Sequence, residues 1–95
     1  MDVWYVYIIR CGDGTLYTGM SIDPERRFAE HVEGGRRAAR YLKGRGPLEL
    51  LFTREAGSRV RAMNLERRIK ELPRRRKLAL IENPDEAATI FESRL

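Results

Sequence analysis

Five side chains of this sequence have the types and the spacing that hydrolysis of a phosphodiester requires: Tyr7, Tyr17, Arg27, His31 and Glu66. Such a reaction needs a proton acceptor for the attacking water, positive charge near the phosphoryl oxygens and help for the leaving oxygen. A tyrosine assisted by a histidine suits the first task, and an arginine suits the second because guanidinium pairs bidentately with phosphate. A glutamate suits the third because Mg²⁺ binds through one or two carboxylates together with water and phosphate.

Each of these side chains also has a purely structural reading. An arginine on a helix, such as Arg27, is more often part of a solvated surface ion pair, and Glu66 has Lys70 four residues later in the order that favours a helix salt bridge. Tyrosines of strands usually pack, as we expect of Tyr5, and we expect the same of Tyr41 in the connector. A tyrosine acts as a base only if its pKa falls well below about 10. A lone histidine is also more often structural.

The first elements that must position these residues form a predicted β-hairpin. Residues 3–9 are β-branched or aromatic throughout, residues 15–20 form a second strand, and a turn signal lies between them. A three-residue loop at Gly12–Gly14, with Gly14 in the left-handed conformation, is the expected connection.

That loop length sets which residues of the hairpin share a face. It places Tyr17 opposite Ile9 and Gly19 opposite Tyr7, so the two tyrosines become diagonal neighbours on one face of the sheet. Gly19 would leave space beside Tyr7 for a bound group. A two-residue loop would put the tyrosines on opposite faces.

A helix is predicted between the Asp-Pro and Gly-Gly pairs at the two ends of residues 23–35, because Asp caps helices, Pro begins them and Gly ends them. Phe28 and Val32 form its expected apolar stripe. Arg27 and His31 lie four residues apart beside that stripe, at the margin of the core.

A basic connector with a helical turn follows at residues 36–46, and a third strand follows at residues 48–54, with Leu48, Leu50 and Phe52 on one face. Further helices are predicted from Ser58 to Pro73 and after Pro73, with a short terminal helix at residues 85–95. At helical spacing Glu66 points toward the body of the protein. The buried stripe of the first of these helices is expected to be Ala62, Leu65, Ile69 and Leu72.

Length and composition favour one domain over residues 1–95, a single layer of sheet covered by helices with a modest core. No stretch approaches the roughly 18 apolar residues of a membrane span, and the first residues lack the basic region of a signal peptide. The single cysteine, Cys11, excludes an internal disulfide and the usual zinc spacings. The expected location is cytoplasmic.

The net charge of +5 hides a strong asymmetry. Residues 36–77 contain 15 Lys/Arg and 4 Asp/Glu, a net charge of +11, whereas residues 1–35 and 78–95 each carry −3. A concentrated basic segment is typical of nucleic-acid binders, although a solvated basic surface gives the same pattern.

The chemistry-bearing residues, in this order, resemble the GIY-YIG nuclease superfamily. Tyr5-Val6-Tyr7 corresponds to the first signature element and Tyr17-Thr18-Gly19 to the second, ten residues later. Arg27, His31 and, in "LERRIKEL", Glu66 take the positions of the remaining family residues. The resemblance runs from about residue 3 to residue 82 and is strongest to the small single-domain bacterial branch.

The resemblance implies an α/β (α+β) fold with a small, mainly antiparallel three-stranded sheet flanked by helices. It also implies Mg²⁺- or Mn²⁺-dependent attack of water on a phosphodiester. Tyr7 would be the base, and Tyr17 would support it or orient the water. Arg27 would bind the scissile phosphate, His31 would tune the tyrosine and Glu66 would hold the cation. No organic cofactor is implied.

The expected partner is nucleic acid, DNA more than RNA, cut as a branched or damaged structure, with a protein partner that supplies specificity. Tyr5 in place of the first glycine is tolerated in this branch, but Met20 stands where many members have lysine. A weakly active or inactive nucleic-acid-binding module therefore stays open, as does an interaction domain for an acidic protein. The side chains expected to contact nucleic acid are Arg36, Arg37, Arg40, Lys43, Arg45 and Lys70.

Overall fold

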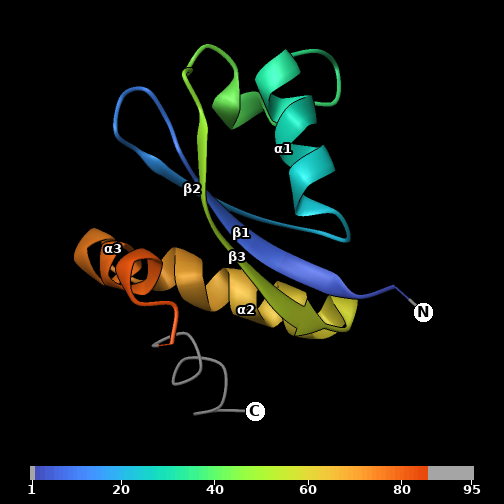
Figure 1. Ribbon diagram of the computed structural model, residues 1–95, viewed down its shortest axis with the longest axis vertical. Helices are drawn as coiled ribbons and strands as arrows, with labels where there is room; N and C mark the ends of the chain where they lie inside the picture. Colours follow the sequence, from blue (N-terminus) through green and yellow to red (C-terminus); the bar gives the residue numbers. More distant parts are fainter. Residues whose placement is uncertain (1, 86–95) are drawn as a thin grey trace.

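The structure, a computed structural model, describes residues 2–85, and nearly all of the terminal helix expected at residues 85–95 lies outside them. The chain runs through β1 (Trp4–Arg10), β2 (Leu16–Ser21), α1 (Pro24–Glu33), the 3₁₀ turn η1 (Arg40–Leu42), β3 (Glu49–Gly57), α2 (Arg59–Glu71) and α3 (Arg74–Glu82). The sheet has the order β2-β1-β3 and both pairs are antiparallel. The expected α+β fold with a three-stranded antiparallel sheet and flanking helices is confirmed (Figure 1).

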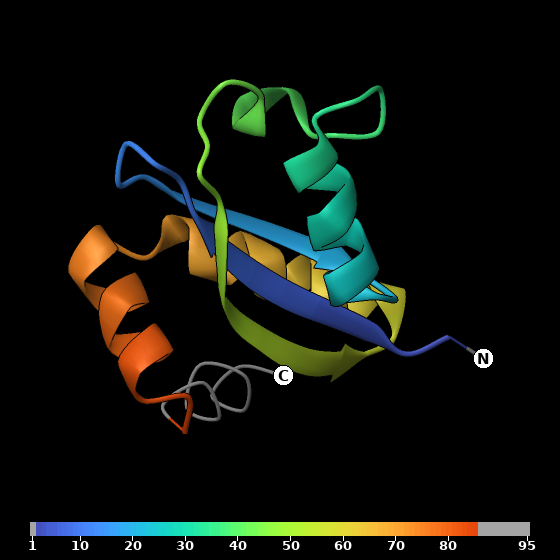
Figure 2. The ribbon, with the colours of Figure 1, turned by 45° about the horizontal axis from the view of Figure 1, so that its top comes forward.

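Helices lie on both faces of the sheet (Figure 2). On one face, Val6 and Ile8 of β1 pack against α2 and α3 in an apolar cluster that includes Ile69 and Leu80. On the other face, Tyr7 and Ile9 pack with residues of α1 and of the connector before β3. The alternation of side chains along β1 therefore divides the core into two clusters.

The β1–β2 hairpin has the predicted loop and register. Cys11 donates its backbone N–H to the Thr15 carbonyl, and Gly14 has a φ of 87°. Tyr7 pairs with Gly19, and Ile9 pairs with Tyr17. The two tyrosines consequently lie on the same face of the sheet.

The prediction that Leu48, Leu50 and Phe52 share one face is wrong. Ile8 pairs with Phe52 and Ile9 pairs with Leu50, so the ladder shifts by one residue between them. A β-bulge places two residues of one strand opposite one residue of its partner and reverses the alternation beyond it. Phe52 accordingly packs on the α2 face, whereas Leu48 and Leu50 pack on the α1 face.

The expected ends of α1 are confirmed, but its buried stripe differs. Asp23 accepts a hydrogen bond from the Arg26 backbone N–H, and Gly34 ends the helix with a φ of 75°. Val32, expected to be buried, is 58% exposed, and His31 is buried instead. The imidazole takes the inward position because groups around it satisfy both of its nitrogens, as described below.

The connector between α1 and β3 contains the expected helical turn, η1, and contacts the hairpin loop. The Gly12 N–H donates to the Arg45 carbonyl at 2.6 Å, and the Arg45 guanidinium pairs with Asp13 at 2.7 Å. A Cβ at Gly12 would collide with the Gly46 carbonyl. The predicted Ser58 cap of α2 is present. Among residues 2–85, no helix has the length and apolar character needed to cross a membrane.

Candidate active site

Three aromatic rings meet on the α1 face of the sheet. The ring centroids of Tyr7 and Tyr17 lie 6.5 Å apart, and the His31 ring lies 6.2 Å from Tyr7 and 5.9 Å from Tyr17. Tyr7 is 2% exposed and His31 is 3% exposed. The hairpin register and the buried side of α1 therefore bring together Tyr7, Tyr17 and His31, three of the five candidate residues.

Gly19 is needed for the placement of Tyr7. A Cβ at Gly19 would collide with the hydroxyl and the ring of Tyr7, because that ring lies directly over the glycine backbone. The expectation that Gly19 leaves space for a bound group is therefore wrong. The Tyr7 side chain itself fills the space and passes across β2 to reach His31.

The hydrogen bonds of His31 determine which of its nitrogens carries the proton. The backbone N–H of Ala39 donates to Nδ1 at 3.1 Å, so Nδ1 must be an acceptor. A neutral imidazole then carries its proton on Nε2, which lies 3.1 Å from the Tyr7 hydroxyl. Burial, aided by the Arg27 charge and opposed by Glu30, lowers the pKa of His31 and keeps the ring neutral. His31 is therefore a hydrogen-bond donor to Tyr7 and not an acceptor of its proton.

The Arg27 guanidinium lies between Tyr7 and Glu30. Its Nη1 donates to a Glu30 carboxylate oxygen at 2.8 Å and to the Arg37 carbonyl at 2.5 Å. Burial acts to lower the pKa of Arg27, but hydrogen bonding to Glu30 and the proximity of Tyr7 raise it overall. The positive charge of Arg27 is thus permanent and is held within reach of the tyrosine.

Both tyrosines are protonated in the protein by itself. Burial, reinforced by the neighbouring Tyr17, raises the pKa of Tyr7 to about 12, although Arg27 acts to lower it. Burial also raises the pKa of Tyr17, with Arg27 lowering it and Glu66 raising it. A base role for Tyr7 therefore requires more positive charge than the side chains of the site supply.

Glu66 of α2 comes from the opposite layer and still acts on this site. Its negative charge acts to raise the pKa of both Tyr7 and Tyr17. Glu66 is 23% exposed and pairs with Lys70 at 3.6 Å. This is the helix salt bridge that the sequence analysis gave as the structural alternative to a metal-binding role. Lys70 is 55% exposed, and ion pairs of exposed lysines are weak.

A divalent cation fits this site only with ligands from outside the protein. Within residues 2–85, no three His, Cys, Asp or Glu side chains gather as a metal cluster. Glu66 supplies one carboxylate, which agrees with the way Mg²⁺ retains several waters and takes further oxygens from a phosphate. The donor set therefore suits Mg²⁺ or Mn²⁺ held jointly by protein, water and substrate.

The expected nucleic-acid-binding residues divide between two places. Arg36, Arg37, Arg40 and Lys43 are exposed on the connector. Arg45 is ion-paired with Asp13, and Lys70 lies on α2 beside Glu66.

Two residues that sequence reasoning did not assign to the site also contact it. Tyr41, expected only to pack, stacks on Tyr17 at 5.7 Å between ring centroids and is itself covered by the Arg45 guanidinium at 4.3 Å. Glu30 pairs with Arg27. An aromatic residue within a basic connector and a glutamate three residues after the arginine were the available signals.

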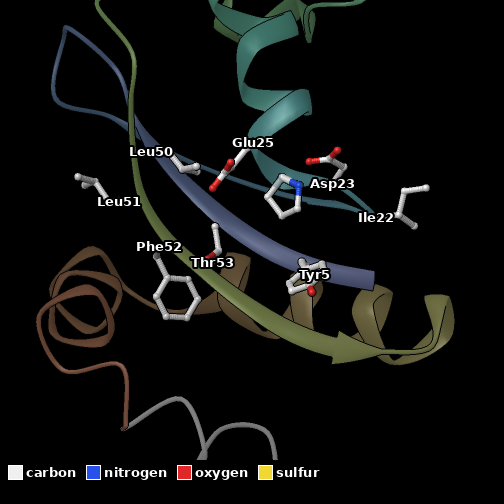
Figure 3. Close-up of a pocket in the computed structure, with 9 residues that line it drawn as sticks. Tyr5, Ile22, Asp23, Glu25, Leu50, Leu51, Phe52 and Thr53 are labelled. Carbon is white, nitrogen blue, oxygen red and sulfur yellow. The ribbon is translucent and has the colours of Figure 1, made fainter. Parts of the chain in front are cut away.

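Met20 and the neighbouring groove contribute nothing to this group of residues. Met20 packs against the apolar cluster of the α2 face, away from the tyrosines. A groove of about 460 Å³ lies between β3 and the start of α1, where Glu25 lies over Leu50 and Thr53 and Asp23 lies toward Ile22 (Figure 3). Its carboxylates disfavour phosphate, and none of the five candidate residues lines it.

Comparisons with known proteins show the family to which the chain belongs. The model of the GIY-YIG catalytic domain matches residues 3–79. A UPF0213 protein of Cronobacter sakazakii is 47% identical over 81 residues, covering 85% of this chain and 83% of its own. The UPF0213 protein YhbQ of Salmonella arizonae is 38% identical over 93 residues, covering 98% of this chain and 91% of its own.

A solved structure gives the same result. The solution NMR structure of a UPF0213 protein from Bacillus halodurans has a TM-score of 0.54 and 40% identity, over 92% of this chain and 94% of that one. The family model covers most of the chain and includes all five candidate side chains. Four of them lie in the hairpin and α1, and the fifth, Glu66, lies in α2. This protein belongs to the GIY-YIG catalytic-domain family.

Proposed function

We propose that this protein hydrolyses phosphodiester bonds of nucleic acid, DNA in preference to RNA, in a reaction that depends on Mg²⁺ or Mn²⁺. The observation that carries the proposal is the environment of the Tyr7 hydroxyl. The hydroxyl receives a hydrogen bond from the Nε2–H of His31, and its pKa is lowered by the charge of Arg27 and raised by that of Glu66. His31 and Arg27 favour a phenolate, Arg27 can bind a phosphate, and the Glu66 carboxylate can hold a cation that offsets its own effect on the tyrosine.

In this proposal Tyr7 takes a proton from the attacking water. The Nε2–H of His31 donates to the Tyr7 oxygen, and the nearby positive charge of Arg27 favours the deprotonated form of Tyr7. Tyr17 orients the water, since its ring packs beside both Tyr7 and His31. Arg27 also binds the scissile phosphate and offsets the charge that develops there.

Glu66 is the residue proposed to hold the divalent cation. When bound, the cation supplies positive charge that lowers the pKa of nearby acidic groups and neutralises the leaving oxygen. Because the described residues form no cluster of three such ligands, the proposed affinity for the cation is low until substrate phosphate is present.

The basic connector supplies the contacts to the rest of the substrate. Its exposed arginines and Lys43 follow directly after α1, which carries Arg27. They recognise phosphate and not base sequence, which suits a substrate chosen by its shape, such as branched or damaged DNA. We propose that a protein partner adds specificity and that the protein acts in the cytoplasm.

A weakly active or inactive nucleic-acid-binding module is the second candidate function. The Tyr7 pKa of about 12 favours it, because such a tyrosine is almost fully protonated near neutral pH. The fold and the basic connector would serve binding equally well. The two functions differ in whether added cation produces cleavage.

The test is a cleavage assay on labelled single-stranded, duplex and branched DNA and RNA, with Mn²⁺, with Mg²⁺ and with EDTA. Wild-type protein is compared with Glu66→Ala and with Glu71→Ala, which removes an exposed carboxylate from the same helix. We expect cleavage that EDTA abolishes, that Glu71→Ala retains and that Glu66→Ala loses. Activity should rise with pH from 7 to 9, because the ionised fraction of Tyr7 rises.

Cleavage that survives Glu66→Ala would contradict the assignment of the metal ligand. Uncut substrates with salt-sensitive binding would support the binding module, because phosphate contacts weaken as salt increases. No binding to either polymer at low salt would remove both candidates.

A further inference from the structure

Glu30 is surrounded by arginines beside the proposed active site. One carboxylate oxygen of Glu30 pairs with Arg27 at 2.8 Å, and the other lies 3.6 Å from Arg37 and 3.9 Å from Arg26. The Glu30 side chain is only 20% exposed. Hydrogen bonding to Arg27 is the main cause that lowers the pKa of Glu30, and the two other arginines act in the same direction, so the carboxylate remains ionised.

The three ion pairs of Glu30 are unequal. Arg27 is 31% exposed, whereas Arg26 and Arg37 are 71% and 73% exposed. Exposed ion pairs contribute little because water screens them, and short charge-assisted hydrogen bonds away from solvent contribute more. The Glu30–Arg27 contact is therefore the specific one.

The Glu30 contact also constrains the direction of the Arg27 guanidinium. The same Nη1 that binds Glu30 donates to the Arg37 carbonyl. A guanidinium is planar and rigid, so fixing Nη1 at two acceptors limits where the other nitrogens point. The charge of the group also acts to lower the pKa of the Tyr7 hydroxyl, so Arg27 acts on the tyrosine as well as on Glu30. Arg27 is thus held at Nη1 by Glu30 and by the connector, at a place where its charge acts on Tyr7.

We propose that Glu30 is a positioning residue that keeps Arg27 turned toward Tyr7 and the scissile phosphate. This rests on the proposed nuclease function and assigns a role to a residue outside the five candidates. Glu30 acts through Arg27 and does not touch substrate. An orienting role predicts that removing the Glu30 charge lowers kcat. A simple charge effect predicts stronger phosphate binding instead, because a negative charge next to the phosphate site is lost.

The experiment compares wild-type protein with Glu30→Gln and with Glu33→Gln, which removes a charge from an exposed position of the same helix. We expect Glu30→Gln to lower kcat by about tenfold to a hundredfold, because small misplacements of catalytic groups have effects of that size. KM should stay the same or fall. Glu33→Gln should leave kcat at the wild-type value, and Glu30→Asp should recover part of the loss.

The second readout is the ¹H–¹⁵N resonance of the Arg27 side-chain Nε–H. In the wild-type protein it should be resolved and exchange slowly with water, because the guanidinium is fixed. In Glu30→Gln it should move toward the position of exposed arginines and exchange faster. Thermal unfolding of each variant verifies that the comparison is made on folded protein, and Glu30→Asp provides a second variant if Glu30→Gln does not fold.

A wild-type kcat and an unchanged Arg27 resonance in Glu30→Gln would overturn the proposal. An equal loss of kcat in Glu33→Gln would also overturn it, because the effect would then not depend on the contact with Arg27. If no nucleic acid is cut by the wild-type protein, the proposed function fails. The Arg27 resonance would then still decide whether Glu30 orients that arginine.

Discussion

The two faces of the sheet contain different kinds of buried side chain, although β1 supplies residues to both. The face against α2 is apolar, with Ile8 of β1 packed in the same cluster as Ile69 of α2. The face against α1 buries a phenol and an imidazole, Tyr7 and His31, at 2% and 3% exposure. Burying apolar groups is favourable by itself, whereas burying polar groups is unfavourable unless they are hydrogen-bonded.

The difference shows which interactions fix the side chains of the candidate site. On the α1 face the Ala39 N–H, the His31 ring and the Tyr7 hydroxyl form a continuous series of hydrogen bonds. That series offsets the burial of polar groups and also defines the tautomer and the direction of each group. Substitutions of the apolar residues on the α2 face should therefore change stability, and substitutions of the hydrogen-bonded residues on the α1 face should change activity as well.

The largest expected effect is that of Tyr7→Phe on catalysis. Removing the proposed base should lower the rate of cleavage about 10²- to 10⁴-fold. The buried Nε2–H of His31 would lose its acceptor, so the free energy of unfolding should also fall by about 1–3 kcal/mol. Single-turnover cleavage assays and urea denaturation measure the two effects.

Tyr5→Phe is the matched control for this change. Tyr5 lies on the same strand but lines the groove beside α1. It should retain wild-type activity and stability. A Tyr7→Phe variant that cleaves as fast as Tyr5→Phe would remove Tyr7 from the mechanism.

Ile69→Ala should give the largest loss of stability. Ile69 is 0% exposed within the α2 cluster, and truncating such a residue lowers the free energy of unfolding by about 2–5 kcal/mol. Ile22→Ala, at a position 48% exposed, should change it by less than about 0.5 kcal/mol. Urea denaturation checks both, and similar values for the two variants would contradict the division between the faces.

Thr18→Val should raise stability, because Thr18 is a polar exception on the apolar face. It pairs with Ile8, is 3% exposed, and its hydroxyl has no hydrogen-bond partner among residues 2–85. Valine has nearly the same shape and buries no unsatisfied group, so the free energy of unfolding should rise by about 1 kcal/mol. A loss of stability in urea denaturation would show that the hydroxyl has a partner in solution.

The local features of the fold could be predicted because local rules govern them. The three-residue loop set the hairpin register, and Asp23 and Ser58 marked the starts of α1 and α2. Helical spacing correctly turned Glu66 toward the body of the protein, and its charge reaches the tyrosines.

The features that the sequence did not reveal depend on contacts between distant segments. The β-bulge before Phe52 leaves no signal, since the strand pattern continues through it. His31 displaced Val32 from the core because Ala39 and Tyr7, from two other segments, satisfy its nitrogens. Simple periodicity favours the apolar residue at such a position, and only the tertiary partners reverse that preference.

The smallest expected effect is a pH dependence of stability that comes from His31, the one histidine of the chain. Burial, with help from Arg27 and against the effect of Glu30, lowers its pKa in the folded protein below the ordinary value near 6.5. The unfolded chain therefore binds more protons as the pH falls through this value. The free energy of unfolding should decrease between pH 7.5 and about pH 5.5.

The His31→Gln variant separates this effect from other titrations. The pKa values of Glu30 and Asp13 are also lowered, but from ordinary values of 4.5 and 3.8, so these carboxylates act at more acidic pH. Urea denaturation at pH 7.5, 6.5 and 5.5 should show a slope in the wild-type protein and a flatter response in His31→Gln. An equal slope in both would mean that the imidazole is as readily protonated in the folded protein as in the unfolded chain. The Ala39 N–H, which binds only an unprotonated Nδ1, would then not be holding the ring in the neutral form that the α1 face requires.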